Sequence, residues 1–455
     1  MKSSRRLSAA LGAAFLVDRS LAAATSGVFN VLSINVAGLP EFLNNNDVPG
    51  DKATNAATLG SKFAEYDLDV IHLQEDFNYH AYIYETDTHP YRTSTSGGVP
   101  FGSGLNTLSN FPWADFRRIK WDECSNASEF DCLTPKGFTF MRVAISGPTS
   151  NNGSTTVVYV DFYNLHADAG TEDGDTAARQ DNINQVAAHI AEWSVGNAVV
   201  VYGDTNSRYS RAGDTAIRAL FDKSGGPGLT DAWVELEHGG EVPAEASACG
   251  NPAESGECEV VDKVFYRSSP LVALQATAFR YDGARFLQPD GNILSDHNPV
   301  FVEFSWEAGK GLRQSEFSGG AAYGTWFSDV PTLTAIDKPK PQALTFRGGS
   351  RLDGVALRLA DGTRLTHGGA GGTEVSLELD PSEYWVRAEL CRGKKDGKTR
   401  NFYIRAATSA GRTLEAGTRT EDCTSFMAED GWQIVGFVGQ DGDEIDLLAF
   451  LYAPK

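Results

Sequence analysis

Residues 199–206 read VVVYGDTN, an apolar run that ends abruptly in glycine and three polar residues. An uninterrupted run of mostly β-branched residues is typical of a strand that is covered on both faces. Gly203 is expected to let the backbone turn, which leaves Asp204 and Asn206 at the carboxyl end of the strand. Because side chains alternate along a strand, both should point the same way and could orient a water or hold a metal. Taken alone, the stretch also fits a strand followed by an ordinary polar turn.

The chain has 455 residues, which is too long for one ordinary domain and predicts two or three. Its hydrophobic content of 41%, with 11% aromatic residues, indicates packed cores rather than disorder. The formal net charge is -21. This charge argues against nonspecific nucleic-acid binding, which relies on clusters of Lys and Arg, but it leaves room for a nuclease with a local basic patch.

The N-terminus has the order of features of a secretory signal peptide, expected over residues 1–24. Lys2, Arg5 and Arg6 precede an apolar run over residues 7–17, and small residues at 22–24 offer a cleavage site. The alternative is an amphipathic N-terminal helix. No other stretch reaches the ~18 apolar residues of a membrane span, so we expect a secreted, extracellular protein without a transmembrane segment.

Cysteine usage agrees with secretion. The six cysteines fall in three neighbouring couples, Cys124 with Cys132, Cys249 with Cys258, and Cys391 with Cys423. Six cysteines allow 15 pairings, of which the nearest-neighbour set is favoured, and no couple has the CxxC spacing of a zinc site. The triplets that begin at Asn126 and Asn152 are acceptors for N-glycosylation, which predicts a glycoprotein.

The order of predicted elements divides the chain. Strands are expected over 28–36, 69–75, 138–145, 157–165, 199–202, 260–266 and 300–304, with helices over 54–66 and 176–192 and a short one near 216–221. Alternating strands and helices predict an α/β layered domain over residues 27–306. A linker is expected at 307–314, and the Gly-rich, strand-rich remainder, 315–455, predicts an all-β domain.

Polar residues recur at the ends of the apolar strands of the first domain. Strand ends in α/β sheets gather on one edge, where ligands usually bind. Each residue alone would fit a strand terminator or a structural role, but their repetition predicts a site. The set is Asn35, Glu75, His166, Asp204 with Asn206, Asp262, and Asp296 with His297.

These residues lie in six motifs that resemble the endonuclease/exonuclease/phosphatase superfamily of magnesium-dependent phosphoesterases. The resemblance covers residues 28–305 and implies a four-layer α/β/β/α sandwich. The motifs, in chain order, are LSINVAGLP, DVIHLQED, NLHAD, GDTN, VDKVFY and SDHNPV.

The resemblance also implies the roles of the strand-end residues. Glu75 would be the principal ligand of Mg²⁺, with Asn35 beside it and a contribution from Asp296; Mn²⁺ or another divalent cation could serve instead. The residue expected to activate the water is Asp204, with Asn206 helping to place it. His297, next to Asp296, would contact the phosphate or transfer a proton. His166 would stabilise the transition state or assist the leaving group, and Asp262 would orient His166.

The substrate class is inferred from local resemblance to the neutral sphingomyelinase branch at residues 89–112 and at Leu165-His166-Ala167 with Arg179-Gln180. This branch implies a phospholipase C-type cut, and a lipid or small phosphodiester is preferred over DNA. Arg142 and Lys136 are candidate phosphate contacts, or else solvated charges on an edge strand. No long aromatic run predicts bilayer insertion, so membrane contact would be peripheral. A deoxyribonuclease-like nuclease and a phosphomonoesterase remain as alternatives.

The C-terminal segment 315–455 resembles a jacalin-type lectin domain, a three-sheet β-prism. The resemblance rests on Gly319-Gly320, on the glycine cluster at 368–372 and on the loop Gly442-Asp443-Glu444-Ile445-Asp446. It implies that Asp446 accepts hydrogen bonds from sugar hydroxyls and that backbone N–H groups of Asp443, Glu444 and Gly320 donate, with mannose-type glycans preferred. The alternatives are a β-prism with a purely structural role and a carbohydrate-binding protein whose phosphoesterase-like domain is inactive.

Overall fold

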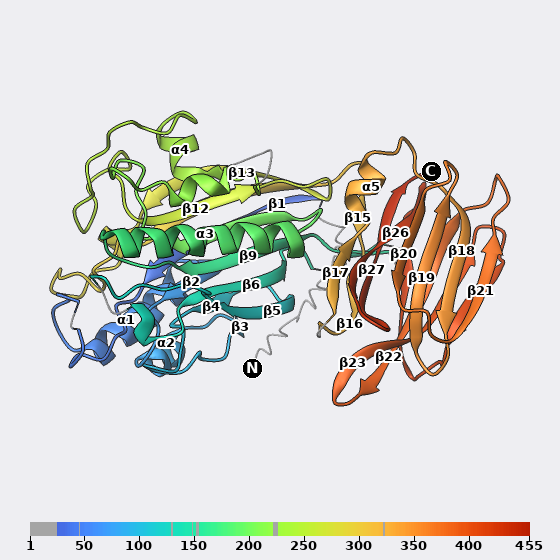
Figure 1. Cartoon of the computed structure of the whole chain (residues 1–455), viewed down its shortest axis with the longest axis horizontal. Coiled ribbons are helices and arrows are strands. Elements are labelled where there is room, and N and C mark those ends of the chain that lie inside the picture. The colour runs from blue at the N-terminus through green and yellow to red at the C-terminus, as the bar shows by residue number, and fades with distance from the viewer. Residues whose placement is uncertain are drawn as a thin grey trace, which may run out of the picture.

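Two six-stranded sheets packed face to face form the N-terminal domain in the computed structural model (Figure 1). The structure describes residues 25–455 except 45, 129–130, 148, 152–153, 222–225 and 322–323. In spatial order, the first sheet contains β13 (Val272–Tyr281), β14 (Val300–Ala308), β1 (Ser26–Asn35), β2 (Val70–Gln74), β4 (Asn106–Ser109) and β3 (Tyr91–Arg92). The second contains β11 (Thr230–Asp231), β12 (Asp262–Arg267), β10 (Ala198–Asp204), β9 (Tyr159–His166), β6 (Gly137–Ala144) and β5 (Trp113–Lys120).

Helices cover the outer faces of both sheets and complete four layers. The first sheet packs on α1 (Lys52–Glu65) and α2 (His80–Thr86), and the second on α3 (Asp173–Trp193). The side chain of Asp51 caps α1, whose Leu59 and Phe63 are buried against the first sheet. Between the two sheets lies a separate apolar core that includes Phe29, Phe162 and Val200. The predicted α/β/β/α sandwich is confirmed.

Strand direction explains why polar residues gather at one place. β1 is parallel to β2, and β9 is parallel to β10, so the carboxyl ends of each pair lie together. β12 runs antiparallel to β10 and begins at Asp262, directly opposite Asp204, which in turn lies opposite His166. We call this margin, where β1, β2, β9 and β10 end and where β12 and β14 begin, the polar edge.

The structure corrects or completes several local predictions. The short helix expected near residues 216–221 is a 3-10 turn, η2 (Ala216–Leu220). Sequence analysis did not predict α2, α4 (Ala232–Glu237) or the ten-residue β13, nor the 3-10 turns η1 (Asp131–Leu133) and η3 (Gly283–Arg285). A small hairpin joins β7 (Thr149–Asn151) and β8 (Ser154–Thr156). The segment predicted as a linker, 307–314, is partly regular, because β14 extends to Ala308 and Arg313–Gln314 forms β15 of the next domain.

The C-terminal domain is built from three antiparallel sheets around one core, as a β-prism requires. One sheet contains β15, β27 (Ile445–Pro454), β26 (Trp432–Asp441), β17 (Thr325–Ser328) and β16 (Ser318–Gly319). The second contains β20 (Arg364–Gly368), β19 (Leu352–Leu359), β18 (Pro341–Gly348) and β21 (Thr373–Glu378). The third contains β24 (Thr413–Gly417), β23 (Lys398–Thr408), β22 (Trp385–Lys395) and β25 (Asp422–Met427), and α5 (Val330–Thr334) follows β17.

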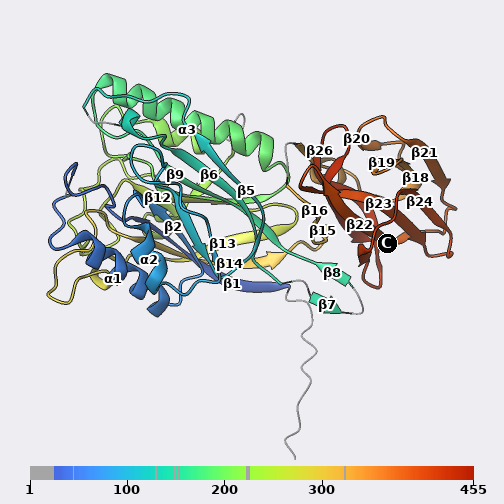
Figure 2. The same ribbon diagram turned by 90° about the horizontal axis from the view of Figure 1, so that it is seen from below.

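The two domains meet at the end of the second sheet that lies opposite the polar edge (Figures 1 and 2). β9 begins beside the C-terminal domain, where the Tyr159 and Phe317 rings lie 4.9 Å apart, and it ends at His166 on the polar edge. Eight residues of strand span about 25 Å at ~3.3 Å per residue. The C-terminal domain therefore leaves the polar edge uncovered.

Arg142 holds this junction, and the prediction that it contacts phosphate is wrong. Its guanidinium group is fully buried, pairs with both oxygens of Asp161 at 2.8 and 2.9 Å, and donates to the Trp193 carbonyl. The Trp326 ring of the C-terminal domain covers it, with the guanidinium carbon 3.5 Å from the ring centroid. Asp161 precedes His166 by five residues on β9, which places Arg142 about 17 Å from the polar edge.

Three disulfides join the cysteines in the nearest-neighbour pairing, Cys124–Cys132, Cys249–Cys258 and Cys391–Cys423, as predicted. Asn126 is exposed, as an acceptor for glycosylation must be, whereas Asn152 and the predicted signal peptide, 1–24, lie outside the described residues. Within the described part of the chain, no helix has the length and apolar character needed to cross a membrane.

Candidate active site

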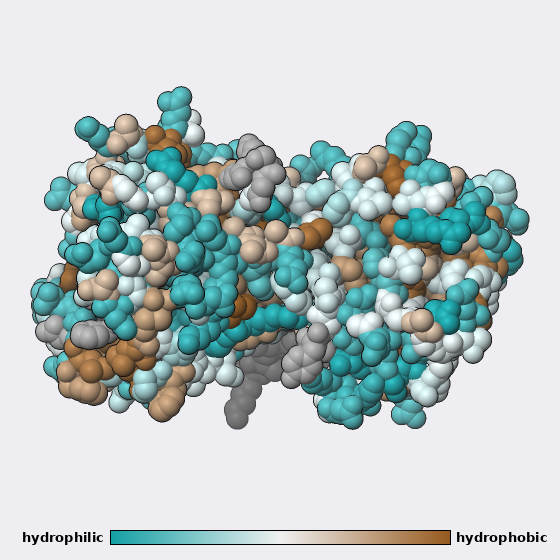
Figure 3. Space-filling view, viewed as in Figure 1, coloured by the Kyte–Doolittle hydropathy of each residue, from teal (hydrophilic) through white to brown (hydrophobic). Residues whose placement is uncertain are grey.

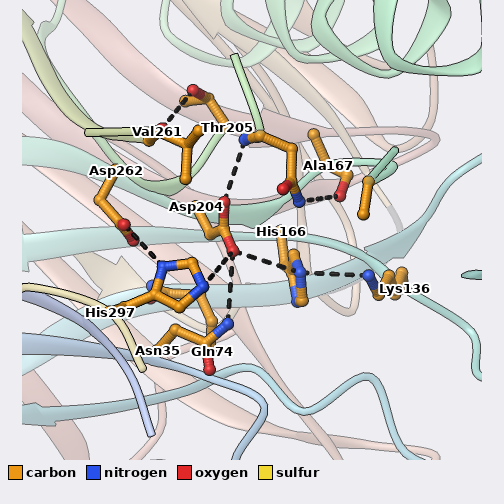
Figure 4. Close-up of polar contacts among 12 residues, drawn as sticks. Asn35, Gln74, Lys136, His166, Ala167, Asp204, Thr205, Val261, Asp262 and His297 are labelled. Carbon is orange, nitrogen blue, oxygen red and sulfur yellow. Dashed lines mark hydrogen bonds and ion pairs between the residues drawn. The ribbon is translucent and has the colours of Figure 1, made fainter. Parts of the chain in front are cut away.

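Asp204 lies at the centre of the polar edge, with three side chains directed at one of its carboxylate oxygens (Figure 4). The Asp204 Oδ2 atom is 3.3 Å from the Asn35 amide, 3.4 Å from His166 Nε2 and 3.8 Å from His297 Nε2. These groups come from both sheets, so the site exists only because the sheets pack together. Asp204 is buried, and burial raises the pKa of its carboxyl group while His297 opposes the shift. A raised pKa makes this carboxylate a better proton acceptor.

The residues around Asp204 fix the direction of its carboxylate. The backbone N–H of Asn206 donates to the other oxygen, Oδ1, at 3.0 Å, and the Asn206 amide donates to the Ala167 carbonyl. Asn206 has a positive φ of 51°, a strained conformation of the kind that clusters at functional sites. Gly203 does not form the expected turn but lies inside β10. Glycine is required there because a Cβ atom would lie 2.1 Å from the Leu165 carbonyl oxygen.

His297 is oriented by Asp262, which corrects the prediction that Asp262 orients His166. The His297 Nδ1 atom lies 2.8 Å from Asp262 Oδ2. Burial alone would lower the pKa of His297, but the carboxylates of Asp262, Asp204 and Asp296 outweigh it and raise that pKa well above its ordinary value. The imidazole is therefore held as a cation, with Nε2 directed toward the centre of the site, where it can donate a hydrogen bond or a proton.

His166 differs from His297 in charge. Burial, with Lys136 and His297 as positive neighbours, lowers its pKa well below the ordinary value, so this imidazole is neutral. The Lys136 ammonium lies 3.1 Å from His166 Nε2 and forms an ion pair with Asp131. Lys136, predicted as a candidate phosphate contact, is thus brought to the site, whereas Arg142 is not.

Glu75, Asn35 and Asp296, the predicted metal ligands, lie on the first-sheet side of the polar edge. Glu75 directly follows β2 with a φ of +55°, and its Oε2 atom is buried without a hydrogen-bond partner. A buried, unpaired carboxylate oxygen is costly unless a cation is close by. The Asn35 side chain contacts both Glu75 and Asp204, and the exposed Asp296 accepts from Asn46 at 3.1 Å. This set of oxygen donors fits a hard divalent cation.

Sequence analysis did not identify the groups that support His297. The Ser295 hydroxyl donates to the Asn35 carbonyl at 2.5 Å and accepts from the His297 N–H at 3.0 Å. The loop closed by Cys249–Cys258 holds the same segment, because Asn251 donates to the Ser295 carbonyl and the Asn298 side chain bonds to Gly250 and Ala253. The SDHNPV motif contained Ser295 and Asn298, but their partners could not be found without the fold.

Replacing Cys249 and Cys258 together by Ser should therefore lower kcat roughly tenfold or more, with a smaller change in KM, because a small displacement of His297 is costly. The matched control replaces Cys391 and Cys423, a disulfide of the C-terminal domain, and should leave turnover unchanged. Steady-state kinetics on a soluble phosphodiester measures both. Equal effects of the two pairs would contradict this role of the loop.

Most of the groups predicted to bind sugar form hydrogen bonds or ion pairs within the protein. The Gly320 N–H, predicted as a donor to sugar, instead donates to the Asp446 carbonyl at 3.1 Å. The Asp446 carboxylate forms an ion pair with Arg400 at 2.8 Å. Glu444 is held by Arg351 and Lys395, and its hydrogen bond with Arg351 is the main cause that lowers its pKa to about 2. Asp443 stays exposed at the tip of the loop.

Comparison with family models identifies both domains. Residues 51–248 match the model described as endonuclease/exonuclease/phosphatase family 2, and residues 317–451 match the jacalin-like lectin domain. The chain therefore carries an endonuclease/exonuclease/phosphatase-type domain followed by a jacalin-like lectin domain, as the sequence motifs predicted.

Individual relatives match one domain each. A sphingomyelinase of Mycobacterium bovis is 39% identical over 292 residues, which cover 62% of this chain and 54% of that protein. The chain thus spans about half the length of the curated sphingomyelinases it matches. Horcolin of Hordeum vulgare is 28% identical over 126 residues, covering 26% of this chain and 86% of that protein. A solved mannose-binding jacalin-related lectin from Ananas comosus is 20% identical with a TM-score of 0.28, covering 32% of this chain and 99% of its own.

Proposed function

We propose that the protein is a secreted, divalent-metal-dependent phosphodiesterase that makes a phospholipase C-type cut in a sphingomyelin-like lipid. One observation carries the proposal: a buried carboxylate, Asp204, lies between a cationic and a neutral imidazole, beside the unpaired Glu75 oxygen. The sphingomyelinase relative supports the substrate class. Three disulfides and the leader-like N-terminus support secretion.

Each side chain has a separate role when a water molecule attacks the phosphorus atom directly. Asp204 Oδ2 accepts a proton from the attacking water, and its direction is fixed by the Asn206 N–H. His297, kept protonated by Asp262, donates to the phosphate oxygens or gives a proton to the leaving oxygen. Lys136, which is ion-paired with Asp131, adds a second positive charge beside His166. No covalent intermediate is needed, since each proton has a donor and an acceptor on the polar edge.

Glu75, Asn35 and Asp296 would hold the divalent cation, Mg²⁺ or Mn²⁺. When bound, the cation would offset the negative charge that develops on the phosphate oxygens. The unpaired Glu75 Oε2 atom supports this assignment, because the ion would satisfy an oxygen that the protein itself leaves without a partner.

A panel of substrates tests the proposal. With Mg²⁺ present, the full chain should hydrolyse sphingomyelin or another phosphodiester of a lipid head group faster than DNA, inositol phosphates or phosphate monoesters. The acidic chain, at -21, disfavours a polyanionic substrate. Product analysis by mass spectrometry should show a released phosphorylated head group. Faster cleavage of DNA would refute the assignment in favour of a nuclease.

The C-terminal domain is proposed to hold the enzyme on glycans, with mannose-type sugars preferred. It is attached opposite the polar edge, so sugar binding would leave the active site open while raising the local concentration of enzyme. On a glycan array, the full chain should bind mannose-type glycans, and Asp446→Ala should remove binding. The control Asp422→Ala alters an exposed ion pair with Arg392 and should bind normally. Binding that survives Asp446→Ala, or no glycan binding at all, would refute the sugar site.

A further inference from the structure

Large apolar side chains are exposed around the polar edge. Among the described residues, seven large hydrophobic side chains are exposed over more than a third of their surface, and five of them lie on segments that border this edge. Phe42 and Leu43 follow β1, Tyr82 lies on α2 just after β2, Phe101 precedes β4, and Leu133 precedes β6. Figure 3 shows hydrophobic surface gathered at the end of the molecule that carries α1 and α2 in Figure 1. We call these five residues the apolar rim.

The turn that carries Phe42 is fixed in place. Phe42 is 86% exposed on a turn closed by hydrogen bonds to the Pro40 carbonyl. The buried Lys52 ammonium holds this segment from below by donating to the carbonyls of Ala37, Leu39 and Asn44. The Asn46 side-chain oxygen also lies 2.9 Å from this ammonium, so four oxygens surround its three N–H donors and define the position of the loop. These hydrogen bonds fix the turn and keep the phenyl ring of Phe42 exposed to solvent.

Phe101 is presented in the same manner. It is 84% exposed, and its turn is closed by two bonds to the Gly98 carbonyl. Asn78 links this turn to the Phe42 side, because its side chain accepts from Val99 and its N–H donates to the Gly38 carbonyl. Leu133, 46% exposed, lies on the second-sheet side, in the turn whose Asp131 pairs with Lys136. The apolar rim therefore includes residues from loops of both sheets.

We propose that the apolar rim docks the enzyme on a zwitterionic phospholipid bilayer, so that a phosphodiester head group enters the polar edge at its centre. The apolar rim consists of separate loop residues around a polar centre. These residues do not form a groove for a helix, but they can all enter one flat interface. Exposed aromatic and aliphatic side chains partition into the headgroup region of a bilayer. The exposed carboxylates of Glu41, next to Phe42, and of Asp296, at the polar edge, add negative charge, and the chain is strongly acidic, so anionic lipid is disfavoured.

The experiment measures binding of the full chain to phosphatidylcholine vesicles by sedimentation, in an inactive His297→Ala background so that no lipid is cut. We expect binding, and a loss of roughly tenfold or more when Phe42 and Phe101 are both replaced by Ala, with intermediate effects of each single change. Val28→Ala removes a 65% exposed side chain at the other end of β1 and should not alter binding. Vesicles with added phosphatidylserine should bind more weakly.

Two results would overturn the docking surface: no binding to phosphatidylcholine, as expected if a protein partner covers the rim, or equal binding by the double variant and Val28→Ala. Thermal unfolding of each variant confirms that it is folded. The identity of the head group that enters the polar edge rests on the proposed function. A separate hydrolysis assay distinguishes failure of the docking surface from failure of the proposed function. If the unaltered protein cleaves a soluble phosphodiester with Mg²⁺ but binds no vesicles, the docking surface fails alone; if it cleaves no phosphodiester, the proposed function fails whatever the vesicles show.

Discussion

Replacing Asp204 by Asn should lower the turnover of a phosphodiester roughly 10²- to 10⁴-fold, the usual contribution of a positioned general base. Asn keeps the shape and can still accept the Asn206 N–H at the Oδ1 position. It cannot take a proton from water, so kcat should fall while the fold persists. Initial rates on a soluble diester, with thermal unfolding as a check, measure the effect.

Asp231→Asn is the matched control for this change. Asp231 is equally buried and caps α4 by accepting from the Trp233 N–H, a bond that Asn preserves; it lies opposite Phe265, three residues along β12 from Asp262. Its variant should keep normal turnover. If Asp204→Asn were as active as Asp231→Asn, Asp204 would not be the base and the proposed chemistry would need another proton acceptor.

The junction between the domains should give the largest effect on stability. Arg142→Ala leaves the Asp161 carboxylate buried without its ionic partner and removes the stacking on Trp326. Breaking one side of a buried ion pair costs about 3–5 kcal/mol of unfolding free energy. The N-terminal domain should unfold at lower denaturant concentration, and limited proteolysis should cut more readily between the domains.

Arg347→Ala provides the comparison for Arg142→Ala. Arg347 pairs with Glu374 and donates to the Ala370 and Gly371 carbonyls on the surface of the C-terminal domain, where an exposed ion pair contributes about 0–1 kcal/mol. Urea unfolding of both variants and the unaltered chain measures the difference. Similar midpoints for the two variants would contradict the idea that Arg142 fastens the domains together.

The sequence was sufficient to predict which strand-end side chains gather at the polar edge, but not how they pair. Asn35, Glu75, His166 and Asp204 could be grouped because strand ends in a layered α/β fold converge on one edge, and the structure brings them together. Pairing depends on which strand lies beside which. Asp262 lies opposite Asp204 in the sheet, yet its carboxylate reaches His297 from another sheet, and no local pattern shows this.

The other incorrect predictions depend on contacts between residues that are far apart in the sequence. Arg142 was expected on an edge strand in solvent, but β6 lies between β9 and β5, all of its residues are buried, and Trp326 of the other domain covers the guanidinium group. No continuous aromatic run in the sequence predicts the apolar rim, because its members are single residues on separate loops. Gly203 was read as a turn residue, although the neighbouring strand is what excludes a side chain there.

Metal-assisted hydrolysis of a phosphodiester at the polar edge should release phosphocholine from sphingomyelin. The assay compares the unaltered chain with Glu75→Gln, each with Mg²⁺ and with an excess of chelator. Release is expected only from the unaltered chain with Mg²⁺, with near-complete loss in the other three conditions. Release that persists in Glu75→Gln and ignores the chelator would contradict metal-assisted hydrolysis.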